Sequence, residues 1–151
     1  MSDEAVNPKQ EFGNNKVAKS VIPAPVIMEL GLAMMEGAIK YGSHNYRDTP
    51  ILASTYYDAV NRHMDAWWEG ENVDPSSGIS HVTKAIASLV VLRDAMLFGT
   101  FKDNRPKAYP PGWMEAFNSK VVELKQKVGG NADGEPSLFT DLDMQIRNLR
   151  K

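Results

Sequence analysis

The stretch SGISHVTKAIASLVVLRDAMLF, residues 77–98, decides the fold class. Its segment IASLVVL (86–92) has the composition of a strand, but the apolar residues continue a helical period over more residues than a strand contains. We therefore predict a helix over roughly 77–98. Its apolar face is formed by Ile79, Val82, Ile86, Leu89 and Leu97.

Three further helices are predicted around this segment. The first begins near Pro23 and Pro25 and ends before Gly42, because proline suits the first turn and glycine commonly follows a helix end. The second spans ASTYYDAVNRHMDAWWEGE (53–71), with Ser54 or Thr55 as its cap. The third spans WMEAFNSKVVELKQKV (113–128). No strand is predicted, so the expected architecture is an all-α bundle.

The first predicted helix is apolar around most of its circumference, which predicts burial on most sides. One narrow polar stripe interrupts this surface, formed at helical spacing by Glu29, Ala33, Glu36 and Lys40. Charge within a buried helix is costly unless it is paired, bound to a ligand or facing a wet cleft. We expect this stripe to have such a partner.

Composition limits the possible function classes. The chain has 151 residues, enough for one compact domain, and its net charge of −2 without a basic run argues against nucleic-acid binding. It contains no cysteine, which excludes disulfides, thiolate zinc sites and cysteine nucleophiles. The sequence shows neither a signal peptide nor an apolar run of membrane-spanning length, so we expect a cytoplasmic protein, in the host cytoplasm if a phage encodes it.

Carboxylates and histidines carry the chemical signal, because phosphate-cradling glycine loops and the GxSxG motif do not occur. Glu71 and Asp74 have ExxD spacing, which offers oxygen ligands to a hard divalent cation. Asp74 could equally cap the next helix, and Glu71 could be a solvated helix end. Glu36 could be a metal ligand or the partner of Lys40 in an i,i+4 pair. Asp94 is expected to pair with Arg93 or Lys102.

Several motifs together resemble one known family. They are EGAIKYGSHNYR (36–47), RHMDAWWEGENVD (62–74) and SGISHVTKA (77–85). They are similar to motifs of the phage-associated dATP/dGTP diphosphohydrolases, which are related to the MazG-like all-α nucleotide pyrophosphohydrolases. The resemblance covers roughly residues 16–106. It implies a MazG-like helical bundle, usually oligomeric, that uses Mg²⁺ or Mn²⁺ to cleave a (deoxy)purine nucleoside triphosphate to monophosphate and pyrophosphate.

The resemblance also implies roles for individual residues. The implied substrate contacts are Lys40, Tyr41, Asn45, Arg47 and Lys84. The resemblance implies a catalytic and metal-binding group that includes His63, Glu71, Asp74 and His81, of which we expect His63, Glu71 and His81 to be catalytic. We expect Glu71 and Asp74 to bind the metal together with Glu36, which we favour because Lys40 and the following loop lie beside it. The chain departs from the family pattern at Tyr46, where tryptophan is common, and at Lys84, where a second histidine often occurs.

The expected organisation is a flexible N-terminus (1–15), a nucleotide pyrophosphohydrolase core (16–106), a packing helix (107–128), and a linker with an amphipathic tail (129–151). The expected partners are a purine nucleoside triphosphate and further copies of the chain, as a dimer or tetramer, with neither membrane nor nucleic acid.

Two alternatives remain open at this point. The chain could be a non-catalytic helical protein that binds a nucleotide or a host partner. It could also be a histidine–aspartate-type phosphohydrolase, but that class needs an adjacent His-Asp pair, whereas RHMD separates His63 from Asp65.

Overall fold

The computed structural model describes residues 9, 13 and 15–128. The chain divides into two compact units, Met1–Pro106 and Lys107–Lys151, which are described separately. The predicted linker and tail (129–151) lie outside the described residues, as does most of the predicted N-terminal segment (1–15). The prediction of an all-α fold is confirmed.

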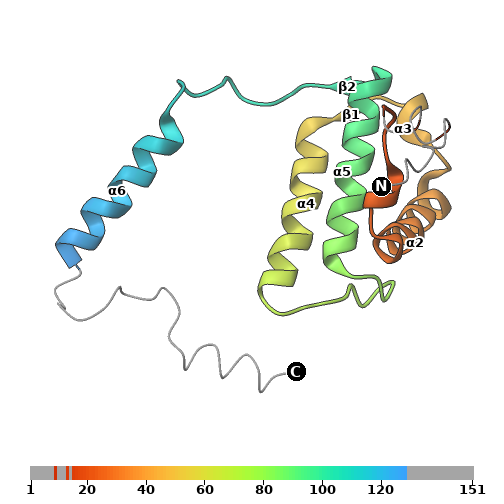
Figure 1. Cartoon of the computed structure of the whole chain (residues 1–151), viewed down its shortest axis with the longest axis horizontal. Helices are drawn as coiled ribbons and strands as arrows, with labels where there is room; N and C mark the ends of the chain where they lie inside the picture. Colours follow the sequence, from red (N-terminus) through yellow and green to blue (C-terminus); the bar gives the residue numbers. More distant parts are fainter. Residues whose placement is uncertain (1–8, 10–12, 14, 129–151) are drawn as a thin grey trace, which may run out of the picture. The chain divides into compact units, whose positions relative to one another are not determined.

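Helix α5 is the centre of the first unit. Helix α4 lies antiparallel beside it, and α2 packs against another side of it (Figure 1). Between residues 15 and 106, the helices of this unit are η1 (Lys19–Val21, a 3₁₀ turn), α2 (Ala24–Tyr41), α3 (Asn45–Asp48), α4 (Ala53–Trp68) and α5 (His81–Phe98).

Two very short strands join the start of α4 to the end of α5. Strand β1 (Ile51–Leu52) pairs in parallel with β2 (Phe101–Lys102), with Ile51 opposite Phe101. The prediction that the chain contains no strand is therefore wrong. Two residues per strand are too few to show a strand period in the sequence, and the pairing arises because extended connectors leave neighbouring helix ends.

A small apolar cluster lies where these strands meet the helices. Tyr46, Ile51 and the fully buried Ala95 form its centre. The backbone carbonyl of Tyr46 accepts a 2.6 Å hydrogen bond from the Thr100 hydroxyl. Tyr46 is therefore a core residue. Partly buried side chains complete the cluster: Met34, Tyr56, Val91, Leu92 and Phe101.

Helix α2 directs its polar stripe towards α5, as the sequence predicts for a charged stripe that needs partners. The Thr83 hydroxyl donates a 2.7 Å hydrogen bond to Glu29, and Lys84 forms an ion pair with Glu36. The prediction that the remaining circumference is buried is wrong. In the described part of the chain its apolar side chains are more than half exposed at Met28, Leu32, Met35 and Ile39.

The connection between α4 and α5 is longer than predicted, because α5 begins at His81 and not near Ser77. Asp74 Oδ1 accepts hydrogen bonds from the Ser76 backbone N–H (2.8 Å) and from the Ser76 hydroxyl (2.6 Å). This local turn competes with helix formation. Ser80 occupies the N-cap position of α5, so Asp74 does not cap that helix.

The N-terminus of α4 is capped from a distant part of the chain. Leu52, not Ser54 or Thr55, holds the N-cap position. The Ser54 N–H donates to Asn104 Oδ1 (2.9 Å), and the Asn104 amide donates back to the Ser54 hydroxyl (2.7 Å). A donor that a helix N-terminus leaves unpaired is thereby satisfied.

The second unit contains α6 (Trp113–Val128), which confirms the helix predicted there. Trp113 and Phe117 form an edge-to-face ring contact with centroids 6.2 Å apart. Among the described residues of the whole chain, no helix combines the length and apolar character needed to cross a bilayer.

Replacement of Asn104 by alanine is expected to lower the free energy of unfolding by about 1 kcal/mol, because the Ser54 N–H loses its acceptor. Urea unfolding followed by circular dichroism measures this change. Asn72→Ala is the matched control, since Asn72 accepts the hydrogen bond from the His81 N–H with its backbone carbonyl, which alanine retains. Equal stability of the two variants would contradict the capping role of Asn104.

Candidate metal and nucleotide site

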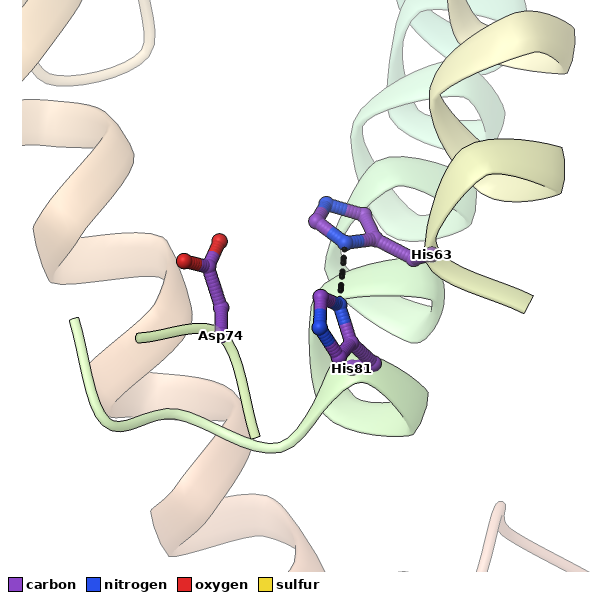
Figure 2. A group of neighbouring side chains, drawn as sticks. All are labelled: His63, Asp74 and His81. Atoms are coloured by element: carbon purple, nitrogen blue, oxygen red, sulfur yellow. Dashed lines mark hydrogen bonds between the residues drawn. The ribbon is translucent and has the colours of Figure 1, made fainter. Parts of the chain in front are cut away.

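Three predicted site residues from three separate segments meet in the first unit. His63 comes from α4, His81 from the first turn of α5, and Asp74 from the loop between these helices (Figure 2). One potential ligand atom from each residue lies within 4.8 Å of the other two. Within residues 9, 13 and 15–128, these three residues form the only group of three or more histidines and carboxylates close enough to share a metal ion.

The two histidines are in direct contact. Their Nδ1 atoms are 2.9 Å apart, so one ring must donate and the other accept (Figure 2). Burial lowers the pKa of His63 below its ordinary value of 6.5, and the neighbouring His81 lowers it further. His63 is therefore neutral near pH 7, which is the form of imidazole that binds metal.

His81 presents an unsatisfied nitrogen. The residue is only 6% exposed, and its Nε2 atom has no hydrogen-bond partner in the described structure. Glu71 Oε2 is 3.7 Å away, beyond hydrogen-bond distance, and the Glu71 side chain is 50% exposed. A buried polar atom without a partner is costly, and a bound cation would satisfy it. The donor set of two imidazoles and one carboxylate thus fits a divalent metal.

Lys84 joins Asp74 to Glu36. Its side chain is 9% exposed, and its Nζ lies 2.6 Å from Asp74 Oδ2 and 3.1 Å from Glu36 Oε2. The hydrogen bond from Lys84, assisted by Ser76, holds the pKa of Asp74 far below its usual range. Two of the three predicted metal ligands, Glu36 and Asp74, are therefore brought together, but by an ammonium group.

Glu36 also forms the predicted pair with Lys40, which is confirmed. Burial raises the pKa of Glu36, but hydrogen bonds from Lys40 and Lys84 outweigh it and leave the pKa below its ordinary value. Glu36 is therefore an ionised carboxylate held between two lysines.

A cavity of about 730 Å³ lies between α2, α3, α4 and α5 and adjoins the group of His63, Asp74 and His81. Its volume is within the range of small-molecule sites. Four of the five predicted substrate contacts line it: Lys40, Tyr41, Asn45 and Lys84. Glu36 and His63 line it as well, so the cavity meets the histidine group at His63.

Arg47, the fifth predicted substrate contact, makes a different interaction. Its guanidinium forms two 2.7 Å hydrogen bonds with the Asp94 carboxylate and lies 5.4 Å from the centre of the Phe98 ring. The prediction that Asp94 pairs with Arg93 or Lys102 is therefore wrong. The hydrogen bond from Arg47 lowers the pKa of Asp94, and the pair attaches α3 to α5.

Sequence reasoning missed other residues that line the cavity, notably Tyr56 and Arg62 on α4 and Ser88 on α5. Tyr56 is seven residues before His63, which places both on one face of a helix. That spacing is a signal that could have identified Tyr56. Arg62 directly precedes His63, and Ser88 is one turn after Lys84.

The pKa of His63 predicts a pH-dependent stability. The unfolded chain takes up a proton on His63 near pH 6.5, whereas the folded chain does so only at lower pH. The contribution of His63 to stability is thus present above pH 6.5 and is lost as the pH falls through the lowered pKa. With a chelator present, urea unfolding at about pH 7.5 and about pH 5.5 should show a smaller decrease for His63→Gln than for the unsubstituted chain.

His44→Asn is the control for this measurement. His44 has a positive φ of 56°, which asparagine tolerates, and it lies outside the histidine group. This variant should lose stability with falling pH as the unsubstituted chain does. An equal decrease for His63→Gln would contradict the assignment.

Comparison with known proteins identifies a family for this chain but finds neither a curated relative nor a similar solved structure. No curated protein matches the chain, and no solved structure does. Residues 6–105 match the family described as dATP/dGTP diphosphohydrolase, N-terminal, and this range contains every residue of the candidate site. The chain therefore belongs to the dATP/dGTP diphosphohydrolase family.

Proposed function

We propose that this protein is a metal-dependent nucleoside triphosphate pyrophosphohydrolase. It would hydrolyse a (deoxy)purine triphosphate of the dATP/dGTP class with one water molecule, giving the monophosphate and pyrophosphate. The observation that carries the proposal is the group of His63, His81 and Asp74 beside a cavity of nucleotide size, with His63 belonging to both. The family to which the chain belongs supports the reaction class.

His63, His81 and Asp74 would hold one divalent ion. Two imidazole nitrogens with one carboxylate suit a transition metal such as Mn²⁺ better than Mg²⁺, which prefers oxygen ligands. When bound, the ion would supply Lewis-acid activation of the phosphoryl group and of the attacking water. The Asp74 oxygens already accept hydrogen bonds from Ser76 and Lys84, and these bonds fix the orientation of the carboxylate.

The charged wall of the cavity would bind the triphosphate. The cavity lining includes three basic residues, Lys40, Arg62 and Lys84. Positive charge at this wall would offset the charge that develops on the departing pyrophosphate. Glu71 carries no lysine partner among the described ion pairs and lies 3.7 Å from His81 Nε2, so we assign it the role of proton acceptor.

The apolar part of the cavity lining would bind the purine. Four members of the core cluster line the cavity: Met34, Tyr46, Tyr56 and Val91. Aromatic and apolar surface of this kind packs against a flat base. Burial raises the pKa of Tyr56, so its hydroxyl remains protonated and can donate a hydrogen bond to the base.

Replacement of Asp74 or His81 by alanine should lower kcat/KM by at least about 100-fold, because each removes a metal ligand. The assay incubates the protein with dATP, dGTP and their ribonucleotide counterparts plus Mn²⁺, and separates the products by ion-exchange chromatography. Asp58→Asn, an exposed change on α4, is the control and should retain activity. Release of tripolyphosphate, or nucleotide binding without turnover, would contradict the proposed reaction.

Mn²⁺ should bind at least about tenfold more tightly than Mg²⁺, because imidazole nitrogens favour the transition metal. Isothermal titration calorimetry on the nucleotide-free protein measures both affinities. His63→Ala should remove most of the preference for Mn²⁺. If Mg²⁺ binds as tightly as Mn²⁺ and His63→Ala leaves both affinities unchanged, the histidines are not ligands.

A further inference from the structure

The side chain of Lys84 occupies the space between two carboxylates beside the proposed metal site. Its Nζ is 2.6 Å from Asp74 Oδ2, and it lies 3.1 Å and 3.2 Å from the two oxygens of Glu36. An ammonium has three donors and no acceptor, so these contacts use it as a compact cation. Asp74 is also a member of the histidine group (Figure 2). The same carboxylate therefore belongs both to that group and to the contacts of Lys84.

Lys84 is fixed where it lies. It is one turn from His81 on α5, which places the two side chains on the same face of the helix. Its side chain is 9% exposed, and its backbone carbonyl accepts a 3.0 Å hydrogen bond from the Ser88 hydroxyl. Moving the ammonium away would leave Asp74 without its closest cationic partner.

The ammonium of Lys84 lies between two carboxylates, a position that a second metal ion could occupy. Many phosphoryl-transfer sites hold two divalent ions about 4 Å apart, with carboxylates shared between them. Here Asp74 and Glu36 together carry two negative charges, which a second divalent ion could neutralise. Lys84 is already bonded to both, and its positive charge repels an incoming cation.

We propose that Lys84 takes the place of a second divalent cation, so that each chain binds one ion and not two. The inference rests on the proposed function, in which His63, His81 and Asp74 hold the first ion. Lys84 then supplies a permanent positive charge that offsets part of the negative charge of Asp74 and Glu36, and it lines the cavity without depending on the supply of free metal.

The test counts bound Mn²⁺ per chain, by equilibrium dialysis with electron paramagnetic resonance of the free ion, and needs no turnover. The unsubstituted protein should bind one ion. Lys84→Met removes the charge but keeps most of the side-chain volume, and it should bind two. Adding Glu36→Gln to Lys84→Met should return the count to one, because the second place then has lost a carboxylate.

Lys40→Met is the matched control. Lys40 also bonds to Glu36, but it is exposed and does not bond to Asp74. This variant should still bind one ion. If Lys84→Met is unstable without metal, Mn²⁺ should raise its melting temperature more than that of the unsubstituted protein, because the ion fills the vacated position.

The outcomes separate the two proposals. Two ions on the unsubstituted protein, or one ion on Lys84→Met with no additional stabilisation by Mn²⁺, would overturn the role of Lys84 and leave the proposed reaction standing. No bound ion on the unsubstituted protein would instead remove the metal site on which the proposed function rests.

Discussion

The buried ammonium of Lys84 is the constraint on which the first unit depends. A charge that is nine-tenths removed from water must be paired, and the partners here come from two other segments, Glu36 on α2 and Asp74 in the connecting loop. This pairing explains why the polar stripe of α2 faces α5, while Met28, Leu32, Met35 and Ile39 on the same helix are exposed. It also explains why the loop returns Asp74 to the first turns of α5, where the carboxylate meets His63 and His81.

The regular parts of this fold could be predicted from the sequence, because they follow from local periodicity. Apolar spacing predicts α2, α4, α5 and α6, and the proline and glycine positions set the ends of α2 well. Predictions failed where a short local interaction or a distant residue determines where a helix begins or how its end is capped. The hydrogen bonds from Ser76 to Asp74 delay the start of α5, and Asn104 replaces the expected local cap of α4. Neither produces a periodic signal in the sequence.

The candidate site also divides into features that the sequence could predict and features that depend on the packing of separate segments. The resemblance supplied the residues, and the structure brings together His63, Asp74 and His81 from three segments, which spacing alone could not establish. The ExxD spacing predicted Glu71 and Asp74 as paired oxygen ligands. Both lie in the loop after α4, where Asp74 joins the histidines and Glu71 is 50% exposed. The sequence could not show that Arg47 pairs with a carboxylate and not with a phosphate, because its partner Asp94 is 47 residues away. Pairings over such separations depend on the packing of whole helices.

The bond between Ser54 and Asn104 has a consequence for biosynthesis. Strand β1 and the first turn of α4 both depend on residues about 50 positions further along, in β2 and just beyond it. While the ribosome has delivered only the segment before β2, the emerging chain lacks the partners that close this corner. The corner therefore closes late, after translation has passed Asn104, and a nascent chain halted earlier would expose an incomplete helix start to chaperones and proteases.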